Sequence, residues 1–349
     1  MAISISILRK IIIPCLAILV LFAGACERGS GSGDKVSEEK EEVVVYSSRI
    51  EELIKPAFDA FTKETGIKVK YTTGKEEELL QRLKAEGENS PADILITVDA
   101  GNLWRAAENE VFQPIESAIL SENIPENLRD QENRWFALTI RSRTIMYNTE
   151  KVSPEELSTY EALGDSKWKE RLALRTSAKV YNQSLVASMI ASLGEEEAEK
   201  VVKGWMANDP EIFGSDVKML EAMAAGQKDV AIANTYYLGR LLKEDPELPL
   251  AVFWPNQDDR GAHVNVSGAG ITKNSPNKDN AVKLLEFLSS AKAQKMFAET
   301  NIEYPVNPDA ELHELLKEWG DFKRDDLNVS ELGSNQVEAV KIMDRAGYK

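Results

Sequence analysis

The chain has 349 residues, of which 43% are hydrophobic and 29% are charged. This length and balance predict about two globular domains with a sizeable core. A formal net charge of −16 makes nucleic acid and anionic membrane surfaces poor partners. The sequence contains two histidines, which argues against a histidine-rich zinc site and a histidine-based catalytic triad.

The first 25 residues have the pattern of an export signal. A basic pair precedes the apolar run at residues 11–22, which is too short to span a bilayer. Three small residues then precede Cys26, as in bacterial lipoproteins whose cysteine is acylated. We therefore expect residues 1–25 to be removed and Cys26 to carry lipid; ordinary signal cleavage is the alternative. Because Cys15 leaves with the signal, the mature chain has no cysteine other than Cys26, which excludes an internal disulfide, a thiolate zinc site and an Fe–S cluster.

Residues 26–42 are rich in Gly, Ser and Glu, and they predict a flexible tether. Strands are expected next at 43–48, 67–71 and 92–98, and an amphipathic helical pattern follows each of them. This repeated β-α-β order predicts a mostly parallel sheet with helices on both faces.

The alternation continues through the rest of the chain. The further expected strands are 135–140 (extended to 148), 172–174, 230–233, 250–254, 263–267 and 270–272. The expected helices are 181–193, 195–206, 217–225, 234–244, 279–288 and 291–299, with a helical tail to residue 349.

One strand–helix junction carries two adjacent tyrosines. The strand at 230–233 leads into a helix in which Tyr236 and Tyr237 occupy the first turn, and Asn234 or Thr235 is expected to cap it. In an open α/β sheet, ligands bind beyond the carboxyl ends of strands, where the helix dipole favours a phenolate. Tyrosinates are hard donors that suit a hard metal ion. The alternative is that Tyr236 packs in the core while Tyr237 covers the surface.

Three other residues also follow strands. Arg49 and Arg141 come directly after strands, and Tyr181 opens a helix after a strand and a loop. In a doubly wound protein such positions face one crevice. Three tyrosinates would neutralise a ferric ion, and two arginines could hold a small bidentate anion such as carbonate. Taken singly, each arginine could instead be an ion-pair residue, and Tyr181 a half-buried packing residue.

Several stretches resemble the ferric-iron-binding proteins of bacterial ABC transporters, the FbpA/FutA family of periplasmic binding proteins. They are residues 45–49, 90–93 with 98–101, 135–138, 181–185, 233–237, 261–268 and 303–308. The resemblance implies a type II periplasmic binding protein fold of class α/β, in which two lobes with mixed sheets are joined by a hinge. It implies an N-terminal lobe of 43–141 with 267–315, and a C-terminal lobe of 142–266 with 316–349.

The same resemblance implies that Tyr181, Tyr236 and Tyr237 bind Fe3+. Many members carry histidine ligands directly after the arginine that matches Arg49, but isoleucine and glutamate stand there in this chain. The chain therefore resembles the subgroup with three tyrosines and a synergistic carbonate or bicarbonate, held by arginines matching Arg49 and Arg141.

Three further residues have weaker assignments. Asp99 lies near the place of a carboxylate ligand in some members, and either Asp99 or water could complete the coordination. His263 matches a family histidine that is not a ligand, so a structural role is expected. Arg240, one turn beyond the tyrosine pair, is either a second-shell residue or a solvated helix residue.

We therefore expect an exported, lipid-anchored, monomeric solute receptor in the periplasm or on the outer face of the cytoplasmic membrane. It would pass ferric iron to an ABC permease and its ATPase, with no catalysis. One alternative is another ligand on the same scaffold, such as sulfate, phosphate or a thiamine-like cation. A second alternative is a hydrolase that uses Asp93 or Asp99, but the sequence shows no nucleophile–base pair for it. A third is a structural envelope protein.

Overall fold

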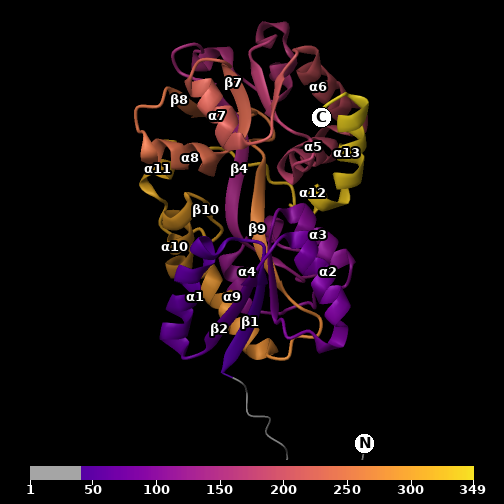
Figure 1. The fold of residues 1–349 in the computed structure, drawn as a ribbon, viewed down its shortest axis with the longest axis vertical. Coiled ribbons are helices and arrows are strands. Elements are labelled where there is room, and N and C mark those ends of the chain that lie inside the picture. Colours follow the sequence, from indigo (N-terminus) through magenta and orange to yellow (C-terminus); the bar gives the residue numbers. More distant parts are fainter. Residues whose placement is uncertain (1–40) are drawn as a thin grey trace, which may run out of the picture. The chain divides into compact units, whose positions relative to one another are not determined.

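One mixed β-sheet runs through the part of the chain that this computed structural model describes, residues 41–349 (Figure 1). The predicted signal peptide, Cys26 and the predicted tether up to residue 40 lie outside the described residues. Within residues 41–349, no helix is long and apolar enough to cross a membrane. Cleavage of the signal and acylation of Cys26 therefore stay predictions.

Three parallel strands open the sheet, and a helix follows each of them. The strands are β1 (Glu42–Ser47), β2 (Lys68–Thr73) and β3 (Ile94–Val98), and the helices are α1 (Glu51–Thr65), α2 (Glu76–Glu86) and α3 (Ala100–Glu108). Helix α1 shows why such a helix packs on the sheet, because its apolar residues Ile54, Phe58 and Phe61 recur on one buried face. Gly66 ends this helix in the left-handed conformation, with a φ of 78°.

Two antiparallel strands form the centre of the sheet. They are β4 (Phe136–Asn148) and β9 (Val264–Ile271), within the strand order β2-β1-β3-β9-β4-β7-β5-β6. Strand β4 pairs with β9 as far as Ser142, and from Arg143 onward it pairs with β7 (Val230–Asn234), so it passes from one half of the molecule to the other (Figure 1). The prediction of a mostly parallel sheet is therefore wrong at the centre, whereas the expected fold with mixed sheets is confirmed.

The second half of the sheet is again parallel at its edge, where β5 (Leu172–Arg175) lies between β7 and β6 (Glu211–Phe213). Two short strands, β8 (Leu250–Phe253) and β10 (Tyr304–Pro305), pair with β4. The helices of this half are α5 (Val180–Leu193), α6 (Glu195–Ala207), α7 (Asp216–Ala224) and α8 (Thr235–Glu244).

The remaining helices lie around the first half and in the C-terminal tail. They are α4 (Ala118–Asn123), α9 (Lys278–Ser289), α10 (Ala291–Asn301), α11 (Glu314–Glu318), α12 (Glu331–Ser334) and α13 (Gln336–Arg345). Short 3-10 helices are η1 (Gly87–Asn89), η2 (Glu126–Leu128), η3 (Pro154–Glu156), η4 (Glu161–Gly164) and η5 (Ser166–Trp168). The tail is helical with breaks, as predicted.

Each half of the sheet has its own apolar core. The first contains Phe58, Phe61 and Trp135 and surrounds β1, β3 and β9. The second contains Trp168 and Trp205 and lies under α5 and α6, and a smaller cluster joins α7 and α8 to the sheet. The molecule therefore has the expected two lobes, whose residue boundaries stay a prediction.

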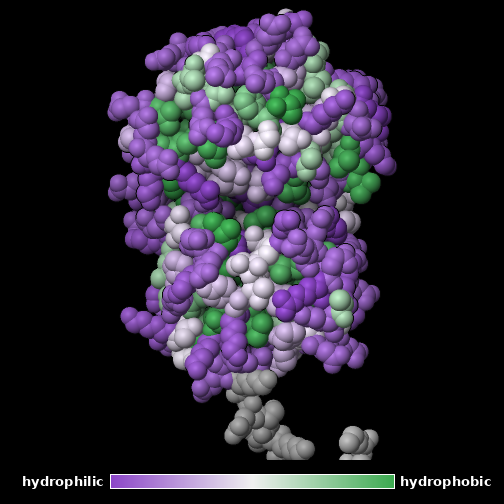
Figure 2. Space-filling view, viewed as in Figure 1, coloured by the Kyte–Doolittle hydropathy of each residue, from purple (hydrophilic) through white to green (hydrophobic). Residues whose placement is uncertain are grey.

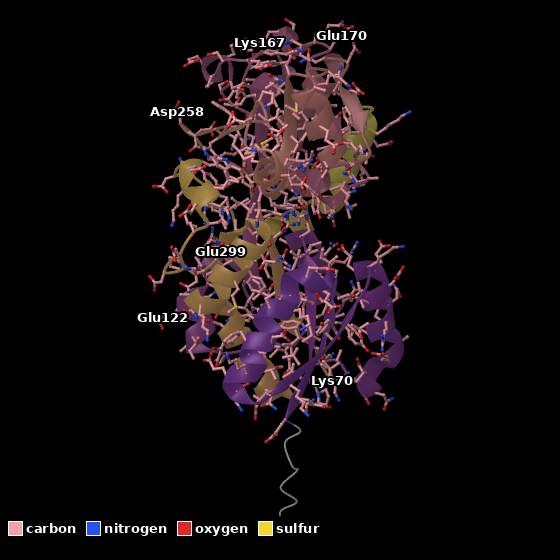
Figure 3. The ribbon with its side chains drawn as sticks, turned by 60° about the vertical axis from the view of Figure 1, so that its left-hand side comes forward. Lys70, Glu122, Lys167, Glu170, Asp258 and Glu299 are labelled. Atoms are coloured by element: carbon pink, nitrogen blue, oxygen red, sulfur yellow. The ribbon has the colours of Figure 1, made fainter. Side chains whose placement is uncertain are left out.

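Charged side chains cover the outside of both halves. Figure 2 shows hydrophilic residues over most of one face. Lysines and acidic residues point outward along the whole length of the molecule in Figure 3. The labelled examples are Lys70, Glu122, Lys167, Glu170, Asp258 and Glu299. Much of the negative charge therefore lies on solvated surface, which favours solubility.

Candidate functional site

The six site residues predicted from the sequence line one cavity of about 180 Å³. They are Arg49, Arg141, Tyr181, Tyr236, Tyr237 and Arg240. Ile50, Leu53, Val98, Ser267, Asn301 and Glu303 complete the wall. Arg49 follows β1, and the tyrosines lie in the first turns of α5 and α8, as expected for side chains beyond strand ends. Arg141 was expected to follow a strand, but it lies inside β4, where it pairs with Asn265 of β9.

Tyr236 and Tyr237 occupy the first turn of α8, directly beyond β7. Their ring centroids lie 4.4 Å apart, and although Tyr236 is buried and Tyr237 half-buried, both face the cavity. Asn234 stands at the N-cap position, but its side chain makes no capping bond within the described chain. Its amide instead donates to Oη of Tyr236 over 3.2 Å, so the predicted cap is a tyrosine-positioning contact.

The surroundings of Tyr181 and Tyr236 favour the neutral phenol over the tyrosinate. Burial raises the pKa of Tyr236 well above its usual value, and the neighbouring tyrosines raise it further. Burial also raises the pKa of Tyr181, against the opposing charge of Arg141, whose guanidinium lies 5.2 Å from the Tyr181 ring centroid. A strong positive charge in the cavity would therefore be needed to deprotonate them.

Arg49 is held in a buried ion pair that the sequence did not predict. Its Nη2 lies 2.5 Å from Oε2 of Glu303, and its Nη1 donates to Oγ1 of Thr139 over 2.9 Å. Thr139 in turn donates to Oε1 of Glu303. Burial would raise the pKa of Glu303, but Arg49 and a hydrogen bond with Asn301 hold that pKa below its usual value.

Arg141 is paired in the same way. Its Nη2 lies 3.5 Å from Oδ2 of Asp99, and its Nη1 donates to Oγ of Ser267. Asp99 is fully buried, with a φ of 80°, and also accepts from Ser184, Asn265 and the backbone of residue 101. Both oxygens are thus occupied, and Asp99 is not among the residues that line the cavity.

Arg143 is a third buried arginine, and the sequence did not reveal it. It donates to Oδ1 of Asn182 over 2.8 Å, to Asp216 over 3.1 Å and to Oδ1 of Asn234 over 3.3 Å. Asn182 directly follows Tyr181 in α5, and Asn234 bonds to Tyr236. One guanidinium therefore positions the start of both helices that carry the tyrosines.

Three other candidates lie outside the tyrosine cluster or at its edge. Arg240 is exposed, and its Nε donates to Asn301 over 3.0 Å. Burial lowers the pKa of His263 to about 3, so its imidazole is neutral, and it does not line the cavity. Asp93 accepts from the backbone of Val44 and from Ser275, so its carboxylate holds β1 against the loop before α9.

A second cavity of about 390 Å³ adjoins the first. The two cavities share Val98 and Tyr181 in their walls. Its polar lining includes Glu76, Arg105 and Lys179. Burial and then the charge of Asp99 raise the pKa of Glu76 to about 7.

Comparison with known proteins gives consistent matches. The pattern of one family, described as bacterial extracellular solute-binding protein, matches residues 56–324. The chain is 48% identical over 320 residues to iron uptake protein A1 of Synechocystis sp., covering 89% of this chain and 88% of that protein.

The chain is also similar to solved structures of iron-binding proteins. A Trichodesmium protein, IdiA or FutA in complex with iron and citrate ligands, is 47% identical with a TM-score of 0.85 and covers 88% of this chain and 100% of that one. The ferric binding protein of Campylobacter jejuni is 38% identical with a TM-score of 0.81, with the same coverage.

Proposed function

This chain belongs to the family of bacterial extracellular solute-binding proteins, and we propose that it captures ferric iron with a small synergistic anion and delivers it to an ABC permease. One observation supports this most: three phenols and two buried guanidinium groups line the same cavity. That set of groups combines hard anionic donors for the metal with cationic donors for an anion.

The iron is cargo, and its ligands in this proposal are Tyr181, Tyr236 and Tyr237. Three tyrosinates carry three negative charges, which balance Fe3+. The metal's charge drives their deprotonation, because phenols otherwise have a pKa of about 10. Arg49 and Arg141 hold carbonate or bicarbonate, which fills the coordination positions that three tyrosines leave open.

Arg240 has a supporting role in the proposal. Its guanidinium lies 5.2 Å from the Tyr236 ring centroid and is anchored by Asn301. From there it favours the tyrosinate form through its charge. It is exposed, so solvent screens this effect.

The protein acts by binding and release, without a covalent step. The tyrosines belong to one lobe as predicted from the sequence, and Arg49 and Arg141 to the other. Iron and its anion would therefore stabilise closure by bridging the two lobes. We infer an exported monomer that is anchored through lipid on Cys26 and works with a permease and a cytoplasmic ATPase. The relatives named above are iron-uptake and iron-binding proteins, which supports transport over catalysis.

The test is a visible absorption titration of metal-free protein with a ferric chelate, with and without bicarbonate. Tyrosinate-bound Fe3+ should give a charge-transfer band that saturates at one iron per chain. Tyr236→Phe should lose the band. Tyr71→Phe is the matched control, because the Tyr71 hydroxyl bonds to Glu51 at the surface, and it should keep the band. Absence of a band under all conditions would contradict the proposal.

A further inference from the structure

The two arginines of the anion site are already neutralised by carboxylates of the protein. Arg49 and Glu303 form an ion pair of 2.5 Å, and each side chain is only 3% exposed. Arg141 pairs with Asp99 at 3.5 Å, and three further donors converge on Asp99. Burial raises the pKa of Asp99, and Arg141 and these donors oppose that rise by favouring the carboxylate. The two pairs together carry no net charge.

This balance limits the charge of the anion. The charges of Fe3+ and three tyrosinates also sum to zero. Apart from these groups and the two ion pairs, the charged residue of the cavity wall is Arg240, at its exposed rim. A singly charged anion would be balanced by Arg240. A doubly charged anion would leave one uncompensated negative charge in a mostly buried cavity, which is costly.

Glu303 also faces the cavity directly. A carbonate oxygen close to this carboxylate would be repelled, because carbonate has no proton to share. Bicarbonate has a hydroxyl group that can donate to a carboxylate oxygen. In addition, the buried Nε of Arg49 has no hydrogen-bond partner among residues 41–349, so it is free to donate to an oxygen of the anion.

We propose that the synergistic anion is bound as a monoanion, bicarbonate in place of carbonate, and that Glu303 sets this specificity by neutralising Arg49. Glu303 is thus a specificity-determining residue that acts on the anion. The inference rests on the proposed iron function, and it adds which charge state of the anion the cavity accepts.

The experiment counts protons released when iron binds. Metal-free protein in weakly buffered bicarbonate solution receives a ferric chelate, while the band and the pH are recorded together and the chelate's own proton change is subtracted. Bicarbonate binding predicts three protons per iron, one from each phenol. Carbonate binding would add a fourth, from the bicarbonate itself. Four protons in the wild type, with the band present, would overturn the inference and leave the iron site standing.

Two variants test the role of Glu303. In Glu303→Gln, the freed charge of Arg49 should favour a dianion, so the count should rise to four and sulfate should begin to support the band. Glu299→Gln alters an exposed glutamate of α10 (Figure 3) and should still release three protons.

The remaining outcomes also test the proposal. A count of three in Glu303→Gln would remove Glu303 from the proposal. Loss of the band in a folded Glu303→Gln protein, even with excess bicarbonate, would mean that Glu303 binds the metal itself and would overturn the inference. If the wild type shows no band at all, the iron function has failed, and this inference fails with it.

Discussion

Ser184 donates a hydrogen bond of 2.7 Å to Oδ1 of Asp99, and this bond joins α5 to the turn between β3 and α3. Asp99 also contacts Arg141, so the same carboxylate links Ser184 to the proposed anion site. We expect Ser184→Ala to weaken iron retention. A hydrogen bond to a charged group contributes about 1.5–3 kcal/mol, which corresponds to at least about a tenfold faster loss of iron.

The measurement is the decay of the visible band after a strong competing chelator is added. Ser188→Ala is the matched control, because the Ser188 hydroxyl bonds to the carbonyl of Leu185 within the same helix. It should release iron at the wild-type rate. Equal rates in both variants would contradict a role for the Ser184–Asp99 bond.

Replacing Arg143 should destabilise the protein and disturb the tyrosines together. Arg143→Met removes the donor shared by Asn182, Asp216 and Asn234. Breaking a buried ion pair typically costs about 3–5 kcal/mol, and Arg175 partly offsets this because it also contacts Asp216 at 3.1 Å.

Urea denaturation gives the unfolding free energy, and the wavelength of the visible band reports on Tyr236. Arg171→Met is the control, since its pair with Asp229 is more exposed and should contribute below about 1 kcal/mol. An Arg143→Met protein with unchanged stability and an unchanged band would refute the positioning role.

Glu76 should make stability depend on pH. Because burial and Asp99 raise the pKa of Glu76 to about 7, its contribution to stability is full below its unfolded pKa of about 4.3 and is lost as the pH rises through 7. Glu76→Gln should therefore gain stability over wild type between about pH 4 and pH 8. The side chain is only half-buried, so we expect about 1–2 kcal/mol after screening.

Thermal unfolding across this pH range checks the prediction. Glu77→Gln alters an exposed glutamate in the same turn of α2, and its melting temperature should follow the wild type throughout. If the melting temperature of Glu76→Gln exceeded that of the wild type by the same amount at pH 4 and at pH 8, Glu76 would not titrate as described.

Gly333 permits a close approach between α12 and α3. A Cβ atom added at Gly333 would lie 2.4 Å from Cβ of Trp104. Gly333→Ala should cost about 1–3 kcal/mol, because overpacking forces side chains and backbone to shift. In contrast, an added Cβ at Gly214 meets nothing within 4 Å, so Gly214→Ala should leave the melting temperature nearly unchanged.

The residues around the cavity differ in how visible they are in the sequence. Tyr181, Tyr236 and Tyr237 follow apolar strand patterns and stand in the first turns of helices, so the local pattern marks them as candidates, and the family resemblance supplies their expected role. The expected family and two-lobe fold are confirmed as well. The roles of Arg143 and Glu303 were missed because they depend on long-range pairing. Glu303 reaches the site because β10, which follows it, pairs with β4. Arg143 contacts Asn182, Asp216 and Asn234, which come from other elements.

The direction of the central strands was missed for a related reason. Residues 136–148 form an unbroken buried strand, and burial on both faces looks the same in parallel and antiparallel sheets. The partner of β4 is β9, which lies far along the chain. Nothing in the local pattern of either strand specifies that they run antiparallel, whereas the short β-α-β links of the first strands do specify parallel pairing.

The central position of β9 has a consequence for how the protein is made. In a chain that emerges from its N-terminus, β3 and β4 are complete long before β9, which lies between them in the finished sheet. Until then both strands present unpaired backbone edges that could join to other chains. A growing chain therefore needs either rapid synthesis or a chaperone until residue 271 has been made. A chain truncated before that residue should aggregate instead of forming a stable first lobe.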